Sequence, residues 1–166
     1  MKSSGEIRKV GKLLSVDAGV KTGLSMFGFD GQLLWYRSQN FGSVQCLKKA
    51  IPALTDNSDL ACLVLEGGGN ITTLWENAAQ RKGISCYSLH AQEWREMILH
   101  GQHWEAGLAK EQSVKWARKV IDYCGGRQQK ALRHDAAESI LCGFYVMIKT
   151  GIIQKPPGSL FPYIHI

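Results

Sequence analysis

The sequence lacks the features that mark membrane, exported and zinc-binding proteins. Its longest apolar stretch near the C-terminus, residues 140–148, is too short to span a bilayer. The polar N-terminus has no apolar signal segment. The cysteines are odd in number and none has the CxxC spacing of a zinc site. We therefore expect a protein without a membrane segment, located in the cytoplasm, or in an organellar matrix if a targeting leader has been removed. We expect all its cysteines to be reduced core or near-core residues: Cys46, Cys62, Cys86, Cys124 and Cys142.

Internal repeats and domain linkers are also missing, and the 166 residues suffice for one domain with a substantial core. We divide the chain into a flexible N-terminus (1–11), the main domain (12–150) and an irregular C-terminal tail (151–166). Acidic residues are in the minority: 14 Asp and Glu stand against 20 Lys and Arg, a net charge of +6. This balance favours a polyanionic partner. Taken individually, the basic pairs are typical of solvent-exposed surface. Taken together, they predict surfaces that contact phosphates: Lys48-Lys49, Arg81-Lys82 and Arg118-Lys119, with Arg127.

The hydrophobic pattern predicts a mixed α/β fold. Apolar runs predict strands at residues 12–17, 23–29, 32–40, 60–66 and 84–89. An Asp-Gly pair joins the second run to the third, which predicts a hairpin and an opening three-stranded antiparallel meander. Helical spacing predicts helices at residues 44–54, 71–82, 91–99, 109–124 and 132–149. Three antiparallel strands, then strand-helix-strand, then helices, is the order of an RNase H-like domain: a five-stranded mixed sheet flanked by helices.

Two acidic residues end predicted strands. Asp17 closes the first strand and precedes Ala18 and Gly19, and Glu66 closes the most hydrophobic strand and precedes three glycines. A carboxylate at the end of a buried strand needs compensation, which a bound cation would supply. Because the first and fourth strands are neighbours in this fold, we expect the two carboxylates to meet. The alternatives are a common Asp-x-Gly turn and a solvent-facing Glu.

Asp135 and Glu138 form a third acidic element. Their spacing of three places them on one face of the last predicted helix, while the apolar residues gather on another side, which we expect to pack. An Asp in the first turn is also favoured by the helix dipole alone. Taken together, four carboxylates with little other ligand chemistry suit Mg²⁺, with Mn²⁺ as a substitute. Two such ions, about 3.5–4 Å apart, would activate a water and stabilise a leaving 3′ oxygen.

In these motifs the chain resembles the RuvC-like Holliday-junction resolvases. The resemblance covers residues 13–149 and rests on the Asp17-x-Gly turn, the strand-terminal Glu66 and the Asp135-Ala-Ala-Glu138 motif. It implies a magnesium-dependent, homodimeric endonuclease that makes paired cuts in four-way DNA junctions, with these four acids as catalytic metal ligands. Relatives usually have Asp where Glu138 stands.

The resemblance also implies nucleic-acid contacts. Lys110 matches a catalytic lysine near the scissile phosphate, and its helical wheel aligns it with a predicted buried stripe; a snorkelling lysine is the plain alternative. The full set of expected DNA contacts is Lys21, Gly68, Gly69, Arg95 and Lys110. Bacterial relatives carry an aromatic-bearing loop after the catalytic Glu, whereas this chain has a shorter glycine turn, with Trp75 expected in the core. A divergent phage, prophage or organellar type therefore fits as well as a bacterial one.

Other functions remain open at this stage. Within the same fold, an RNA-processing nuclease of the RuvX type uses similar chemistry. An actin-like ATPase also begins with an Asp-x-Gly turn, but it needs two such domains, which 166 residues do not supply. A catalytically inactive nucleic-acid-binding module is disfavoured because all four acids are present. We expect the histidine-bearing segment at residues 100–107 to be an exposed loop.

Overall fold

The computed structural model describes residues 10–99 and 106–164. The strands of this part are β1 (Lys12–Asp17), β2 (Lys21–Gly28), β3 (Leu33–Asn40), β4 (Leu60–Glu66) and β5 (Ser85–Leu89). Its helices are α1 (Val44–Leu54), α2 (Asn70–Lys82), α3 (Ala91–Leu99), α4 (Ala106–Tyr123) and α5 (His134–Lys149). None of the helices described is long and apolar enough to cross a membrane. The predicted N-terminal segment lies outside the described residues up to residue 9, as does most of the predicted 100–107 loop, although Ala106 and Gly107 already belong to α4.

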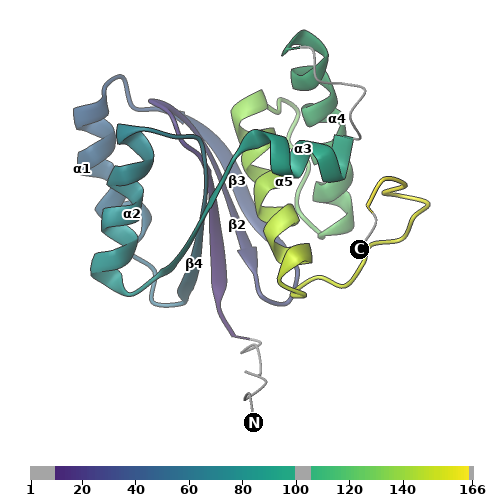
Figure 1. Ribbon diagram of the computed structural model, residues 1–166, viewed down its shortest axis with the longest axis horizontal. Helices are drawn as coiled ribbons and strands as arrows, with labels where there is room; N and C mark the ends of the chain where they lie inside the picture. Colours follow the sequence, from purple (N-terminus) through teal and green to yellow (C-terminus); the bar gives the residue numbers. More distant parts are fainter. Residues whose placement is uncertain (1–9, 100–105, 165–166) are drawn as a thin grey trace.

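The strands form one mixed sheet in the order β3-β2-β1-β4-β5. The β1/β2 and β2/β3 pairs are antiparallel, and the β1/β4 and β4/β5 pairs are parallel. The predicted RNase H-like sheet is therefore confirmed. Helices α1 and α2 cover one face, and α3, α4 and α5 lie on the other (Figure 1).

Each face of the sheet has its own hydrophobic core. Because successive side chains of a strand point to opposite faces, Leu14 and Val16 of β1 pack in the core under α1 and α2. Leu13, also on β1, packs in the core formed with α3, α4 and α5. Alternation places Asp17 on the same face as Leu13, and Glu66 on the same face as Val64, which belongs to that second core. The two strand-terminal acids thus share the face that carries α5.

Helix α5 is buried on nearly all sides. Thirteen of its 16 residues are buried, because it lies between the sheet and helices α3 and α4. We expected only its apolar side to pack, but its acidic side is buried as well. Two glycines allow the close approach: a Cβ on Gly143 would lie 2.6 Å from the Phe27 ring, and one on Gly23 would lie 1.9 Å from the carbonyl oxygen of Asp135. The last helix is thereby held against β1 and β2.

All five cysteines are free, as predicted, but the predicted core location is wrong for two of them. Cys62, Cys124 and Cys142 are buried, whereas Cys46 and Cys86 are exposed. Cys46 lies in the first turn of α1, where its backbone N–H is capped by Ser43. Cys86 lies on β5, the edge strand of the sheet, where four of the five residues are exposed. Local hydrophobicity does not reveal that these positions are left uncovered by neighbouring elements.

The C-terminal tail has no helix or strand over residues 151–164, as expected, but it completes the core. Ile153, Phe161 and Ile164 are buried there. The Phe161 ring lies 5.2 Å from that of Phe144 on α5 and 6.0 Å from that of Trp116 on α4. The tail therefore packs against both α4 and α5.

Candidate metal centre

One row of paired residues crosses the sheet at the site. Asp17 is paired with Glu66 on β4 and, on its other side, with Gly23 on β2. Gly23 is in turn paired with Ser38 on β3. The row lies at the carboxyl ends of the parallel strands β1 and β4, where ligand sites form in open α/β sheets.

Three carboxylates converge over this row. Asp17, Glu66 and Glu138 each offer an oxygen, and these oxygens all lie within 4.8 Å of one another. Glu66 is 9% exposed and Glu138 is 8% exposed. The strand ends supply the first two and α5 supplies the third from above. Such a set of hard oxygen donors suits Mg²⁺ or Mn²⁺.

Asp135 lies beside the cluster but is engaged elsewhere. Its Oδ2 accepts a hydrogen bond of 2.6 Å from the Ser38 hydroxyl, and its Oδ1 accepts one of 2.8 Å from the Ala136 N–H. The missing side chain of Gly23 makes room for the backbone of Asp135. Of the four predicted acids, the structure brings three together and leaves this one at the border. Ser38 was not predicted; its place near the end of β3, opposite a glycine, is the signal that could have found it.

Arg95 enters the site from α3. Its Nη2 donates a hydrogen bond of 2.9 Å to Oε1 of Glu138. Its guanidinium also lies over the Trp94 ring, 5.2 Å from the centroid. The buried Nε–H of Arg95 finds no hydrogen-bond acceptor among the described residues. The residue predicted as a DNA contact is therefore held here by a carboxylate of the cluster.

Burial and mutual repulsion perturb the acids. Burial, followed by the negative charges of Glu66 and Glu138, raises the pKa of Asp17 to about 9. Burial and Glu138 likewise raise the pKa of Glu66, and Arg95 opposes that rise. A bound cation would stabilise the ionised carboxylates of such a site, because its positive charge offsets their mutual repulsion. The chemistry of the donors and their electrostatics therefore both fit a divalent metal ion.

The remaining predicted contacts do not belong to the carboxylate cluster. Lys21 is exposed at the start of β2. Gly68 and Gly69 are exposed in the turn between β4 and α2, where an added Cβ would meet nothing within 4 Å. Lys110 is exposed in α4, in contrast to the inward stripe, of which Ala117 and Ile121 are buried.

These features define the fold class, a RuvC-like RNase H fold. The structure is similar to the fowlpox virus Holliday junction resolvase, with a TM-score of 0.64 and 15% identity over 83% of this chain and 99% of that one. It is also similar to Thermus thermophilus RuvC, with a TM-score of 0.59 and 11% identity over 85% of this chain and 97% of that one. Both neighbours have also been solved with Holliday junction DNA. No protein-family model and no curated protein sequence matches the chain. At these identities the likeness shows the fold.

Proposed function

We propose that the protein is a divalent-metal-dependent endonuclease that resolves four-way DNA junctions, acting as a homodimer in the cytoplasm or an organellar matrix. The observation that carries the proposal is the convergence of Asp17, Glu66 and Glu138 within 4.8 Å at the strand ends. The fold shared with two Holliday-junction resolvases supports the choice of substrate. The net charge of +6 suits a polyanion.

The chain's own residues have separable roles in this proposal. Asp17, Glu66 and Glu138 would hold the metal, and Asp135, oriented by Ser38, would complete the set from the border of the cluster. When bound, Mg²⁺ supplies Lewis-acid polarisation of the phosphate and a more acidic water. The rigid placement of the carboxylates comes from two paired strands and a buried helix, so little reorganisation is needed when the substrate binds.

The proposed reaction is hydrolysis of a phosphodiester. The oxygen of a water molecule bonds to phosphorus, the bond from phosphorus to the 3′ oxygen breaks, the water gives up a proton to the solvent, and the leaving 3′ oxygen takes up a proton from the solvent. The products are a 5′ phosphate and a 3′ hydroxyl. Lys110, exposed in α4, would contact the scissile phosphate from outside the cluster. A four-way junction needs two symmetric cuts, which is the reason for proposing a homodimer.

A cleavage assay tests the proposal. Labelled four-way junction, fork, duplex and RNA hairpin are incubated with the protein and Mg²⁺ or Mn²⁺, beside Asp17→Asn and the matched surface control Asp56→Asn. Paired cuts confined to the junction, abolished in Asp17→Asn and retained in Asp56→Asn, are expected. Cleavage that survives Asp17→Asn would refute the mechanism. Cleavage of the RNA hairpin alone would replace the function by RNA processing.

A further inference from the structure

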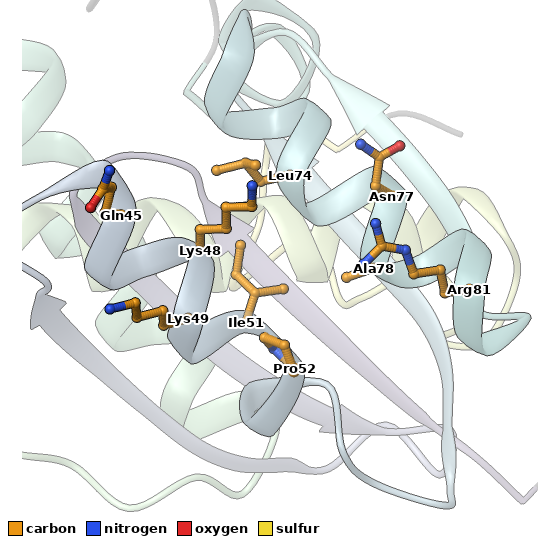
Figure 2. A pocket seen from close by; sticks show the side chains of 9 residues that line it. All are labelled: Gln45, Lys48, Lys49, Ile51, Pro52, Leu74, Asn77, Ala78 and Arg81. Atoms are coloured by element: carbon orange, nitrogen blue, oxygen red, sulfur yellow. The ribbon is translucent and has the colours of Figure 1, made fainter.

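A groove between α1 and α2 lies on the face of the sheet opposite α5. Its volume is about 630 Å³, and Figure 2 shows the side chains that line it. Ile51 of α1 and Leu74 and Ala78 of α2 contribute apolar surface to it. Lys48 and Lys49 on α1 and Arg81 on α2 contribute positive charge, and none of the described residues that line the groove is acidic.

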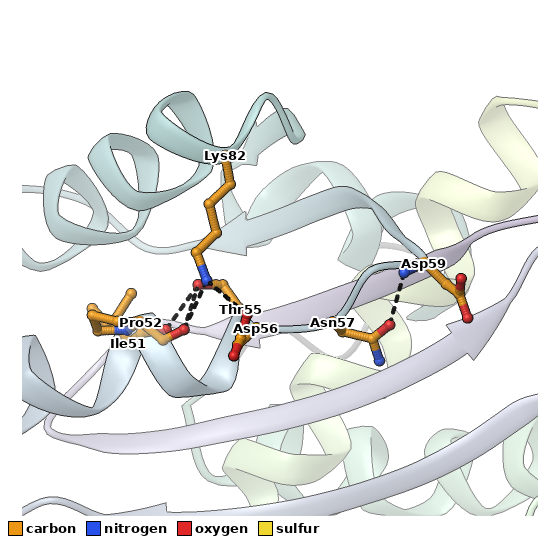
Figure 3. Close-up of polar contacts among 7 residues, drawn as sticks. All are labelled: Ile51, Pro52, Thr55, Asp56, Asn57, Asp59 and Lys82. Carbon is orange, nitrogen blue, oxygen red and sulfur yellow. Dashed lines mark hydrogen bonds and ion pairs between the residues drawn. The ribbon is translucent and has the colours of Figure 1, made fainter.

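These three basic side chains are uncompensated. Within residues 10–99 and 106–164, no hydrogen bond or ion pair engages the side chain of Lys48, Lys49 or Arg81. Their neighbour Lys82 differs, as Figure 3 shows: its Nζ donates a 2.8 Å hydrogen bond to the Pro52 carbonyl and lies 3.8 Å from Asp56. Lys82 is therefore used to tie α2 to the end of α1, whereas the three groove residues remain available to an anion.

The groove lies between two helices that both start at the carboxyl end of β1 and β4, where the carboxylates lie. Helix α1 follows β3, which ends at Asn40, and α2 follows β4, which ends at Glu66. Both helices therefore start at this end of the sheet and run away from it. Between Glu66 and α2, the exposed Gly68 and Gly69 leave open space where side chains would otherwise stand. This turn, which follows Glu66 directly and opens α2, therefore presents no side chain between the carboxylate cluster and the groove helix.

We propose that this groove binds the phosphate backbone of a duplex arm of the DNA substrate, with Lys48, Lys49 and Arg81 as the contacts. This inference rests on the proposed function. Two-fold pairing with a second copy through the groove is disfavoured, because it would bring the three positive charges against their own equivalents. The groove residues include no aromatic side chain on which unpaired bases could stack.

The length of α2 sets the shortest DNA arm that could contact the whole groove, which gives the proposal a geometric test. The 13 residues of α2 rise about 20 Å at 1.5 Å per residue, which equals about six base pairs at 3.4 Å each. An arm shorter than this cannot extend from the glycine turn to Arg81. The groove residues should therefore contribute to the binding of long arms and not of short ones.

The experiment measures binding without cleavage, in Ca²⁺ or EDTA, over a series of salt concentrations. Junctions with arms of about 15 base pairs are compared with junctions whose hairpin-capped arms have about five. The triple variant Lys48→Gln/Lys49→Gln/Arg81→Gln is compared with Lys82→Gln, which removes one positive charge from α2 at a residue that does not line the groove. Thermal unfolding verifies that both variants are folded.

For the long arms, we expect the triple variant to bind roughly tenfold more weakly and to lower the slope of log affinity against log salt by about 3. Lys82→Gln and all short-arm measurements should change little. If the triple variant binds long arms as Lys82→Gln does, the groove proposal is overturned, whether or not the wild-type protein cleaves junctions. If the protein cleaves no junction, the same series on plain duplexes of both lengths still decides the groove. If labelled poly-glutamate binds the wild type and not the triple variant, while binding of long arms is unchanged, an acidic protein partner replaces DNA.

Discussion

Arg95 and Glu138 form an ion pair of 2.9 Å that joins α3 to α5 at the border of the carboxylate cluster. The pair engages Oε1 of the Glu138 carboxylate, a group that would also hold a metal ion, and the Arg95 charge opposes the rise in the pKa of Glu66. We therefore expect Arg95 to stabilise the metal-free protein and to compete with a bound metal ion.

Arg95→Gln should change two properties in opposite directions. Without metal, the free energy of unfolding should fall by about 1–2 kcal/mol, because carboxylate repulsion is no longer relieved. Affinity for Mn²⁺, measured by calorimetry, should rise by roughly threefold to tenfold, because the competing cation is gone. Arg95→Lys serves as the charge-retaining control. Unchanged Mn²⁺ affinity together with weaker DNA binding would mean that Arg95 is a DNA contact, as the sequence had indicated.

Asp17 makes the stability of the metal-free protein depend on pH. Its pKa is raised from 3.8 to about 9 in the fold, so between these values the folded state binds a proton that the unfolded state does not. The stabilisation from this group is full below about pH 4 and is lost as pH rises towards about 9. In EDTA, the unfolding temperature of Asp17→Asn should therefore increase relative to that of the wild type as pH rises. The unfolding temperature of Asp59→Asn should show no such relative increase. A difference that is independent of pH would contradict the assignment.

Gly23→Ala should separate α5 from the sheet. The added Cβ would lie 1.9 Å from the Asp135 carbonyl oxygen, a backbone atom that cannot move without the helix. We expect a loss of about 3 kcal/mol or more in denaturant unfolding. Gly68→Ala is the matched control, because its Cβ would meet nothing within 4 Å, and it should change stability by less than about 0.5 kcal/mol. Equal stability of the two variants would show that α5 does not approach β2 so closely.

Phe161→Ala tests the role of the tail. The side chain is 1% exposed among the rings of α4 and α5, so its removal should cost about 3 kcal/mol through lost burial and a residual cavity. Leu160→Ala, next to it and 44% exposed, should cost less than about 1 kcal/mol. Chemical denaturation measures both. A small loss for Phe161→Ala would mean that the tail is dispensable for the core.

Lys110→Gln should slow junction cleavage by roughly tenfold to a hundredfold if the lysine contacts the scissile phosphate. Lys115→Gln removes the same charge from an exposed position of the same helix and should leave the rate nearly unchanged. Single-turnover cleavage with saturating protein separates this effect from binding. Equal rates for the two variants would assign Lys110 to the general positive surface.

The sequence predicts best those contacts that follow from the order of the strands. Strand order alone predicts that Asp17 and Glu66 meet, since both end neighbouring parallel strands. The place of Ser38 opposite a glycine could have marked it as a candidate. The partners of Ser38 and Arg95 could not be predicted, because each depends on how α5 or α3 is placed over the sheet. For the same reason Asp135 could not be separated from Glu138: both share a helix face, but only packing decides which carboxylate turns to the cluster. Helical spacing also placed Lys110 on the inward stripe, yet Lys110 is exposed while its neighbour Ala109 is buried.

Helix α5 is the last helix of the described chain, and it brings both the third carboxylate of the cluster and the largest part of one core. A chain still on the ribosome can pair β1 with β4 and place Asp17 beside Glu66, but it has no Glu138 until α5 emerges. Domains fold as they are synthesised, from the N-terminus onward. The carboxylate centre is therefore completed only after α5 has been synthesised, so a chain that stopped before α5 would carry an exposed sheet face and an incomplete centre.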